Sequence, residues 1–345
     1  MLSLQPDNLS KTELPISTTW LHGACMEAKG KQDLWLRQKP EVITALREQA
    51  IIQSSESSNR IEGVTVPVDR LRPILIGKSR PQDRCEEELV GYRQALNWIY
   101  SRKRPVKIDS RIIIRCHEMA QGGFSGDAGQ WKKRNNAIIE ILPNGERRIR
   151  FKPVMPKQVP KMVNCLCTNY EDLYQQGRVP ALLAVATFIF DFLCIHPFRD
   201  GNGRVSRLLT TLLLQEQDFV VGRYISLERL VEESKEDYYR ILEQCSKDWH
   251  KGKNELVPWW NYFLGILKRA YDEFARRIEE SEGSGKSELV RQIITGQLEP
   301  FTLSELQSQC PSVSMQLIKK VLAGMKKAGK VRLNGRGRGA SWEII

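Results

Sequence analysis

Apolar residues recur at intervals of three and four positions along most of this chain, which is the spacing of helices that bury one face. The spacing predicts helices over residues 40–58, 85–100, 109–119, 156–176, 180–195, 205–217, 226–247 and 257–280. Among these, the segment 179–190 is almost entirely apolar, but Asp191 ends it at a length that is too short to cross a bilayer. It therefore predicts a helix buried in the core of a mostly α protein.

One segment in the middle of the chain departs from this helical spacing. Residues 136–142 are rich in isoleucine, 143–145 read Pro-Asn-Gly, and β-prone residues return at 148–151. Asn-Gly is favoured in two-residue hairpin turns, because both residues tolerate positive φ. The segment 136–151 therefore predicts a β-hairpin inserted between helices.

Residues 281–287 are rich in Gly and Ser, a composition typical of a linker, and a separate region is expected after them. Residues 288–345 predict three short helices and a hairpin, with a capping box from Thr302 to Glu305 at the start of the second helix. This order resembles a winged helix-turn-helix. Basic side chains lie on its third helix and at its wing tip, namely Lys319, Lys320, Lys326, Lys327, Arg336 and Arg338. They would suit nucleic acid phosphates, but winged helices also dock proteins, and both alternatives stay open.

The net charge and the spacing of the cysteines indicate the kind of partner and the cellular compartment to expect. The 345 residues carry a net charge of +12, which favours an anionic partner. Residues 1–14 are polar and lack the apolar stretch of a signal peptide. The eight cysteines follow neither a zinc-site nor a disulfide-framework spacing. We therefore expect a cytoplasmic protein with reduced thiols and no membrane partner.

The stretch with the richest chemistry is 196–207, which reads HPFRDGNGRVSR. It lies between two predicted helices, so its glycines and arginines precede or open a helix, where free amides and the helix dipole attract phosphate. Gly201 and Gly203 let the backbone approach phosphate oxygens. Arg204 and Arg207 are three residues apart, so both can project on one side of the helix and make forked bonds to phosphate.

Two other side chains of this stretch suit catalysis. Asp200 cannot bind phosphate directly, but beside a polyphosphate its carboxylate suits Mg²⁺. His196 is the one group of the stretch that titrates near neutral pH, which suits a general base. Pro197 and Phe198 are interpreted as structural, the first stiffening the loop and the second anchoring it in the core. The stretch therefore predicts a polyphosphate site with a base beside it.

The order His-Pro-Phe-x-Asp-Gly-Asn-Gly-Arg-x-x-Arg resembles the signature of the Fic (filamentation induced by cAMP) family, and residues 196–207 match it at every specified position. The resemblance extends over roughly 83–260. It implies a Fic-type helical core with a β-hairpin flap. It also implies transfer of AMP from ATP to a hydroxyl side chain (Ser, Thr or Tyr) of a target protein, with release of pyrophosphate.

The resemblance further implies roles for individual residues. His196 would deprotonate the target hydroxyl, and Asp200 would hold Mg²⁺ against the α- and β-phosphates. The phosphates would be bound by five further residues, which are Gly201, Asn202, Gly203, Arg204 and, at the γ-phosphate, Arg207. The hairpin 136–151 would pair with the target backbone as an added strand. Tyr238 and Tyr239 match nucleoside-contacting positions in relatives, but paired aromatics on a helix are also typical of a core, and both alternatives stay open.

A second match lies upstream, where residues 58–63 read SNRIEG. Taken alone, this segment predicts the end of a helix with Gly63 as its C-terminal cap. Beside the stretch described above, it resembles the Ser/Thr-x-x-x-Glu-Gly/Asn inhibitory element of self-inhibited Fic proteins, with Ser58, Glu62 and Gly63 at the matching positions. The resemblance implies that Glu62 pairs with Arg207, so that this arginine is lost to the γ-phosphate and the α-phosphate is misaligned for attack.

The expected chain has four parts, which are an N-terminal helical region with the inhibitory element (1–82), a Fic catalytic core (83–280), the linker (281–287) and a winged-helix-like domain (288–345). The expected protein is a self-restrained protein adenylyltransferase that uses Mg²⁺ and ATP, and a homodimer is compatible with it. Three alternatives stay open. The same pocket could transfer UMP, phosphate or phosphocholine, or it could reverse AMPylation. The third is a DNA-binding regulator whose Fic core only senses nucleotide, although intact His196 and Asp200 argue against it.

Overall fold

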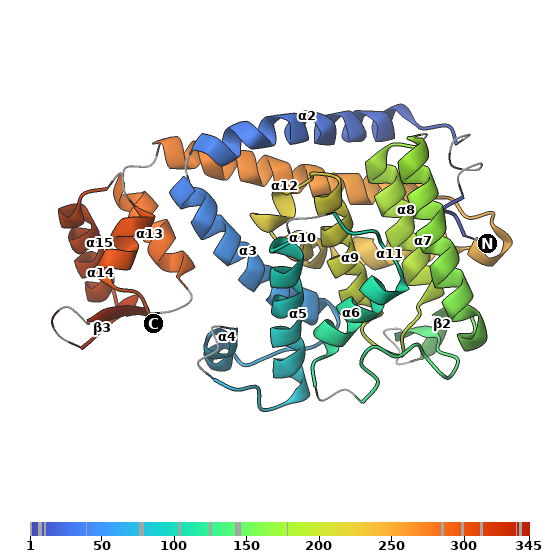
Figure 1. Ribbon diagram of the computed structural model, residues 1–345, viewed down its shortest axis with the longest axis horizontal. Helices are drawn as coiled ribbons and strands as arrows, with labels where there is room; N and C mark the ends of the chain where they lie inside the picture. Colours follow the sequence, from blue (N-terminus) through green and yellow to red (C-terminus); the bar gives the residue numbers. More distant parts are fainter. Residues whose placement is uncertain are drawn as a thin grey trace.

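The computed structural model describes the chain apart from residues 1, 6–8, 10–11, 39, 76–78, 103–104, 124–125, 142–145, 178, 284–285, 298–299, 311–312, 336 and 338–339. The described residues form mostly helices, together with two small antiparallel sheets (Figure 1). The prediction of a mostly α protein is therefore confirmed.

The helices of the first part of the chain are α2 (Ile16–Gln38), α3 (Pro40–Ile61), α4 (Val68–Leu75), α5 (Arg84–Tyr100) and α6 (Ser110–Gln121). After the hairpin come η1 (Pro156–Gln158), α7 (Val159–Gln176), α8 (Ala181–Ile195), α9 (Asn202–Glu216), η2 (Val221–Arg223), α10 (Leu227–Glu233), α11 (Lys235–Ser246), η3 (Trp249–Lys251) and α12 (Val257–Gly283).

Most of these helices follow the predicted ranges to within a few residues, and two of the differences affect the middle of the chain. The helix predicted at 226–247 is divided into α10 and α11, because Ser234 leaves the helical conformation and its hydroxyl bonds back to the carbonyl of Leu230 at 2.9 Å. In addition, α9 begins at Asn202, three residues earlier than predicted. The glycine-rich part of the 196–207 stretch therefore lies in the first turn of α9 itself.

The centre of the molecule is α8, which is buried on nearly all sides. Its side chains include Phe188, Phe190 and Phe192, each fully buried. Helices α7, α9 and α12 pack around it (Figure 1). A helix that is covered all round needs no polar face, which explains the unbroken apolar sequence. Because α8 is held so firmly, the residue that follows it, His196, has a fixed position.

Two long helices on the N-terminal side bracket this core. Helix α2 lies along the upper edge of the molecule in Figure 1 and packs against α12. Helix α3 packs between α5 and α10, and its C-terminal end reaches the start of α9. The sequence spacing predicted α3 to residue 58, and the helix continues to Ile61, followed by Gly63 with φ of 80°.

The hairpin predicted in the middle of the chain consists of β1 (Ile138–Ile141) and β2 (Arg147–Phe151). The strands pair antiparallel with an irregularity between Ile138 and Ile139. The Pro143-Asn144-Gly145 turn lies outside the described residues. The base of the hairpin is fixed where Phe151 stacks on His250 at 5.4 Å between ring centroids.

The C-terminal region contains α13 (Lys286–Gly296), α14 (Leu303–Gln309), α15 (Met315–Lys327), β3 (Val331–Asn334) and β4 (Ser341–Ile344). This is the predicted order, and Thr302 forms the predicted capping box with Glu305. The proposed wing-tip residues Arg336 and Arg338 lie outside the described part of the chain. Helix α12 runs to Gly283, into the segment expected to be a linker, and α13 packs on α3.

No disulfide joins any of the cysteines among the described residues. In the part of the chain that the structure describes, none of the helices combines the length and the apolar character that crossing a bilayer requires.

Candidate active site

His196 follows directly on α8 and turns the chain out of the core. Its backbone is left-handed, with φ of 51°, and its amide still donates to the carbonyl of Phe192 at 2.9 Å. The ring nitrogen Nδ1 lies 3.3 Å from the carbonyl oxygen of Leu193. Because a carbonyl can only accept a hydrogen bond, Nδ1 carries the proton and Nε2 keeps its lone pair. The free nitrogen is the one that can accept a proton from a substrate.

The surroundings of this ring keep it uncharged. Burial lowers the pKa of His196 to about 4, and the nearby positive charge of Lys132 acts in the same direction. The imidazole is therefore neutral at physiological pH, as a general base must be.

The loop between His196 and α9 is closed by two reciprocal hydrogen bonds. The amide of Phe198 donates to Oδ1 of Asn202, and Nδ2 of Asn202 donates to the carbonyl of Phe198, both at 2.9 Å. Asn202 is only 2% exposed. Its side chain is thus committed to the loop, and its backbone amide is the group that remains for an anion.

Neither glycine of this loop has room for a side chain. Gly201 has φ of 78°, and a Cβ there would overlap the amide of Gln121. At Gly203 an added Cβ would overlap the carboxylate of Glu62. The first amides of α9 have no intrahelical partners, and the lack of a side chain at Gly203 lets the Glu62 carboxylate lie against this positively polarised helix end.

Arg204 does not lie where the sequence placed it. Both residues of its ion pair with Glu88 are 1% exposed, and their Nη1 and Oε2 atoms lie 2.6 Å apart. The guanidinium therefore points into the protein toward α5, on a different side from Arg207. The expectation that Arg204 and Arg207 project together fails because α5 supplies a buried carboxylate that attracts only the first of them.

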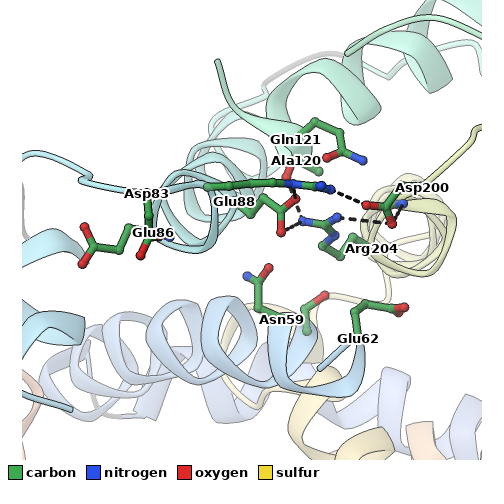
Figure 2. A network of polar contacts seen from close by, with 12 residues as sticks. Asn59, Glu62, Asp83, Glu86, Glu88, Ala120, Gln121, Asp200 and Arg204 are labelled. Atoms are coloured by element: carbon green, nitrogen blue, oxygen red, sulfur yellow. Dashed lines mark hydrogen bonds and ion pairs between the residues drawn. The ribbon is translucent and has the colours of Figure 1, made fainter. Parts of the chain in front are cut away.

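Asp200 belongs to the same polar network, which Figure 2 shows from close by. Arg84 bonds both Glu88 and Asp200, and Nη2 of Arg204 lies 3.9 Å from Asp200. Partial burial raises the pKa of Asp200, but Arg204, the amide of Gly201 and Arg84 together hold it below its ordinary value. The side chain remains about half exposed, at 51%. It is thus a charged carboxylate that is still accessible to a cation.

Arg207 makes the contact that the inhibitory element predicted. Its Nε donates to the hydroxyl of Ser58 at 2.8 Å, and Nη2 donates to the carbonyl of Ser58 at 2.9 Å and to Oε1 of Glu62 at 2.8 Å. Burial opposes the positive charge, but Glu62 outweighs it and keeps the pKa of Arg207 above its ordinary value. The remaining nitrogen, Nη1, is buried without a hydrogen-bond partner among the described residues.

The end of α3 that carries these groups is fastened to α10 as well. The hydroxyl of Ser54 donates to Oε2 of Glu228 at 2.6 Å, and Arg60 makes two bonds to Glu232 at 2.6 and 2.9 Å. Figure 2 shows Glu62 projecting from this end of α3 toward the start of α9. The position of Glu62 is therefore determined by packing and hydrogen bonds of the preceding helix.

Some of these groups line one cavity of about 430 Å³, but Asp200, Arg204 and Arg207 are not part of its lining. The lining includes residues of the 196–207 stretch, the segment after α3, α11 and the hairpin, among them His196, Gly203, Glu62, Tyr238, Tyr239, Ile138, Ile139 and Arg150. The ring of His196 is half-buried and borders this space. A substrate in the cavity would therefore meet the free Nε2 on one side and the strands β1 and β2 on another.

The two tyrosines differ in their surroundings. Tyr238 is 5% exposed and packs within a cluster of aromatic rings that includes Trp259 and Tyr262. Tyr239 is half-buried, and Arg150 of β2 lies over its ring at 5.2 Å. Both line the cavity. The core and nucleoside interpretations are thus compatible for Tyr238, and Tyr239 is the more accessible of the two.

Sequence reasoning missed two residues that hold the loop in place. Nδ1 of His117 accepts a hydrogen bond from the amide of Gly129, so Nε2 carries the proton and donates to the carbonyl of Asp200, 3.1 Å away. The ring of His117 also stacks on Phe198, with 3.7 Å between the ring centroids. Lys132 is 4% exposed and donates to the carbonyl of Ile195 at 3.3 Å. Nothing in their sequence neighbourhoods signals this role, because both reach the loop only through the tertiary fold.

Comparison with known proteins places this geometry in a family. The model of the Fic/DOC family matches residues 107–214, which run from just before α6 to near the end of α9. This part of the chain is a Fic/DOC domain. The domain contains the 196–207 stretch, the hairpin and the buried helix α8, so the resemblance seen in the sequence is confirmed.

Two curated proteins that are similar to this chain have names that describe protein adenylyltransferases. A protein adenylyltransferase Fic from Nematostella vectensis is 25% identical over 241 residues, which cover 66% of this chain and 49% of the relative. A probable protein adenylyltransferase from Aquifex aeolicus (strain VF5) is 23% identical over 180 residues, or 51% of this chain and 52% of the relative. The chain thus spans about half the length of each of these relatives.

Solved structures share the fold beyond the Fic domain. A Fic family protein from Desulfovibrio desulfuricans G20 superimposes with a TM-score of 0.62 and 18% identity, covering 99% of this chain and 98% of that one. A Fic domain containing signaling protein from Bacteroides thetaiotaomicron gives a TM-score of 0.60 and 21% identity, with 74% and 97% coverage. At these identities the comparison concerns the fold alone.

Proposed function

We propose that this protein transfers AMP from ATP to a hydroxyl side chain of a target protein and that Glu62 restrains the reaction by holding Arg207. The observation that carries the proposal is the shared cavity, in which the free Nε2 of His196 faces the same space as the first turn of α9. The adenylyltransferase names of the curated relatives support the same activity.

In this proposal the backbone at the start of α9 binds the phosphates. The free amides and helix dipole of the first turn attract anionic oxygens, and Gly203 lets them approach the backbone. Arg207 supplies the γ-phosphate contact once Glu62 has moved away, since its Nη1 is already buried without a partner among the described residues. Tyr238 and Tyr239 line the part of the cavity assigned to the nucleoside.

The chemistry assigned to the side chains is a single displacement. The target hydroxyl oxygen attacks the α-phosphorus, its proton passes to Nε2 of His196, and the bond from the α-phosphorus to the bridging oxygen breaks to release pyrophosphate. Because the pKa of His196 is about 4, the ring is neutral and ready to accept this proton.

Asp200 fits the role of a magnesium ligand. Mg²⁺ is commonly bound by one or two carboxylates together with substrate phosphates and water, and Asp200 is a charged, half-exposed carboxylate beside the phosphate seat. When bound there, the ion would neutralise charge on the phosphates. Arg84 and Arg204 orient the Asp200 carboxylate.

The strands β1 and β2 are proposed to hold the target. Their backbone can pair with an extended segment of another protein, as in other cases of strand addition. Ile139 and Ile149 are paired across the hairpin and remain 52% and 54% exposed, so they offer an apolar contact to such a segment. This arrangement would bring a hydroxyl of the segment over the cavity.

The nature of the transferred group can be tested with ATP labelled at either end. The Glu62→Gly protein is incubated with α-labelled or γ-labelled ATP, and the Glu62→Gly/His196→Ala protein serves as control. We expect protein-bound label from the α-position only, and none in the control. Label from the γ-position only would identify phosphoryl transfer and overturn the proposal, as would equal α-labelling without His196.

A further inference from the structure

Glu228 is a buried carboxylate that the proposed reaction does not use. It lies in the first turn of α10 and is only 3% exposed. Its oxygens accept hydrogen bonds from the hydroxyl of Ser54 at 2.6 Å and from that of Tyr92 at 2.8 Å. Among the described residues, none of its hydrogen bonds comes from a lysine or an arginine. Burying a carboxylate without a paired cation is costly, so a specific role is expected for it.

Hydrogen bonds connect this carboxylate to Arg207 through two hydroxyl groups. Burial and the charge of Glu228 raise the pKa of Tyr92 well above its ordinary value, so the phenol keeps its proton and donates it to Oε1 of Glu228. Ser58 is hydrogen-bonded to Tyr92 and opposes this rise in pKa, as a donor to the phenol oxygen does. Ser58 in turn accepts from Nε of Arg207, which can only donate.

These four residues form one directed set of hydrogen bonds, which we call the arginine network. It runs from the guanidinium of Arg207 to Ser58, then to Tyr92, and ends on the carboxylate of Glu228. Because every hydroxyl in it has both a donor and an acceptor as neighbours, each proton has one favoured position. The network therefore favours one orientation of the Ser58 hydroxyl.

The arginine network also ties three helices together behind Arg207. Ser54 and Ser58 lie one turn apart on α3 and are 1% and 0% exposed, Tyr92 belongs to α5, and Glu228 belongs to α10. None of the hydrogen bonds in the network involves Glu62, which binds Arg207 at Nη2 instead. The Nε side of the guanidinium therefore stays fixed when Glu62 leaves.

Glu228 is close enough to Arg207 to act on it as a charge. The two side chains border the same small cavity of about 50 Å³. They also act on Tyr92 in opposite directions, since Glu228 raises the pKa of the phenol and Arg207 lowers it. Opposite charges in a protein interior attract over such a range. Glu228 thus supplies a negative charge near Arg207 that is independent of Glu62.

We propose that Glu228 and Tyr92 are positioning residues for nucleotide binding, which hold the guanidinium of Arg207 in one orientation for the γ-phosphate after Glu62 has left. This inference rests on the proposed function, in which Arg207 binds that phosphate. Glu228 and Tyr92 act through Ser58. An arginine that is already ordered loses less conformational freedom on binding, so its bonds contribute more to affinity. ATP gains from this ordering, and ADP does not, because it lacks the γ-phosphate.

The test is the binding of ATP and of ADP, each with Mg²⁺, measured by isothermal titration calorimetry. The background is Glu62→Gly/His196→Ala, which lacks both the restraint and the proposed base. Adding Tyr92→Phe removes only the phenol oxygen, and we expect it to weaken ATP binding by about fivefold and ADP binding by less than about twofold. Glu228→Gln keeps the shape of the side chain and should shift the two affinities in the same way.

Tyr100→Phe is the matched control, because Tyr100 is a second buried tyrosine of α5 and its hydroxyl donates to the carbonyl of Gly222 at 2.7 Å. It should leave the ratio of the two affinities unchanged. Thermal unfolding of each variant checks the fold. Equal weakening of ATP and ADP by both Tyr92→Phe and Glu228→Gln would indicate general loosening and would overturn the inference.

Arg207→Ala in the same background separates this inference from the proposed function. It should weaken ATP binding by more than about tenfold and leave ADP binding nearly unchanged. If it does so while Tyr92→Phe matches Tyr100→Phe, Arg207 binds the γ-phosphate without help from the network, and only the positioning role is overturned. If Arg207→Ala leaves the ratio of the two affinities unchanged, the γ-phosphate contact and the positioning role are both overturned.

Discussion

Two buried arginine side chains project from the same helix, α9, but their surroundings are very different. Arg204 pairs with Glu88, and both side chains are 1% exposed. Arg207 pairs with Glu62, which is 30% exposed and lies just after the last residue of α3. The first pair is enclosed by the core, whereas the second lies at the rim of the cavity.

The difference indicates which pair can open. Separating Arg204 from Glu88 would leave two charges in the core, which is strongly unfavourable. Glu62 can leave toward solvent, and Arg207 would keep its bonds to Ser58. The first pair is therefore suited to hold the loop permanently, and the second is the pair that a nucleotide phosphate would replace in the proposed function.

The largest expected effect is a loss of stability when the pair between Arg204 and Glu88 is broken. Glu88→Ala should lower the free energy of unfolding by about 3–5 kcal/mol, because Arg204 is left buried without its partner. Glu62→Ala should cost less, because Glu62 is 30% exposed and Arg207 keeps its two bonds to Ser58. Urea unfolding of both variants measures the two values. Similar losses in both would contradict the distinction between the pairs.

The next prediction concerns Ser58, which also binds the arginine of the pair between Arg207 and Glu62. Ser58→Ala removes the hydroxyl that accepts from Nε of Arg207, a bond to a charged group worth about 1.5 kcal/mol. Because Arg207 keeps this bond when Glu62 leaves, its loss acts on both arrangements, and automodification with α-labelled ATP should rise much less than in Glu62→Gly, by less than about threefold. Ser55→Ala is the control, because its hydroxyl donates to the carbonyl of Ile51. A rise in Ser58→Ala as large as that in Glu62→Gly would contradict the assignment of the restraint to Glu62.

The smallest expected effect concerns pH. The folded pKa of His196, about 4, lies below the ordinary value of 6.5, so the ring stays neutral until the pH falls toward 4. Between pH 8 and 6, single-turnover transfer by Glu62→Gly should therefore change less than about twofold. A loss of activity centred near pH 6.5, with an intact fold, would show that the ring titrates as if it were exposed.

The sequence predicted those parts of the site that lie in one continuous stretch. Residues 196–207 carry His196, the two glycines and Arg207 in an order that local rules can interpret, and the roles that we propose for them rest on that order. The pairing of Glu62 with Arg207 was also predicted, although the two residues are far apart, because a second motif marked Glu62.

The sequence did not predict the partners that come from distant helices. Glu88 and Lys132 act on the loop only because α5 and the segment before β1 pack against it. The sequence also did not predict helix α2. Its buried face carries the polar residues Thr18 and Gln32, whereas Ile16 and Trp20 lie on its exposed face. Such an inverted pattern is informative only once the packing is known.

The measurement that tests the central claim most directly is the rate of AMP transfer with and without Glu62. Wild type, Glu62→Gly and Glu62→Gln are compared with α-labelled ATP, with Glu56→Gln as control because Glu56 pairs with Arg60 instead of Arg207. We predict that both Glu62 variants exceed the wild type by more than about tenfold, the factor that corresponds to 1.4 kcal/mol, and that the control matches the wild type. Equal rates for all four proteins would contradict the account.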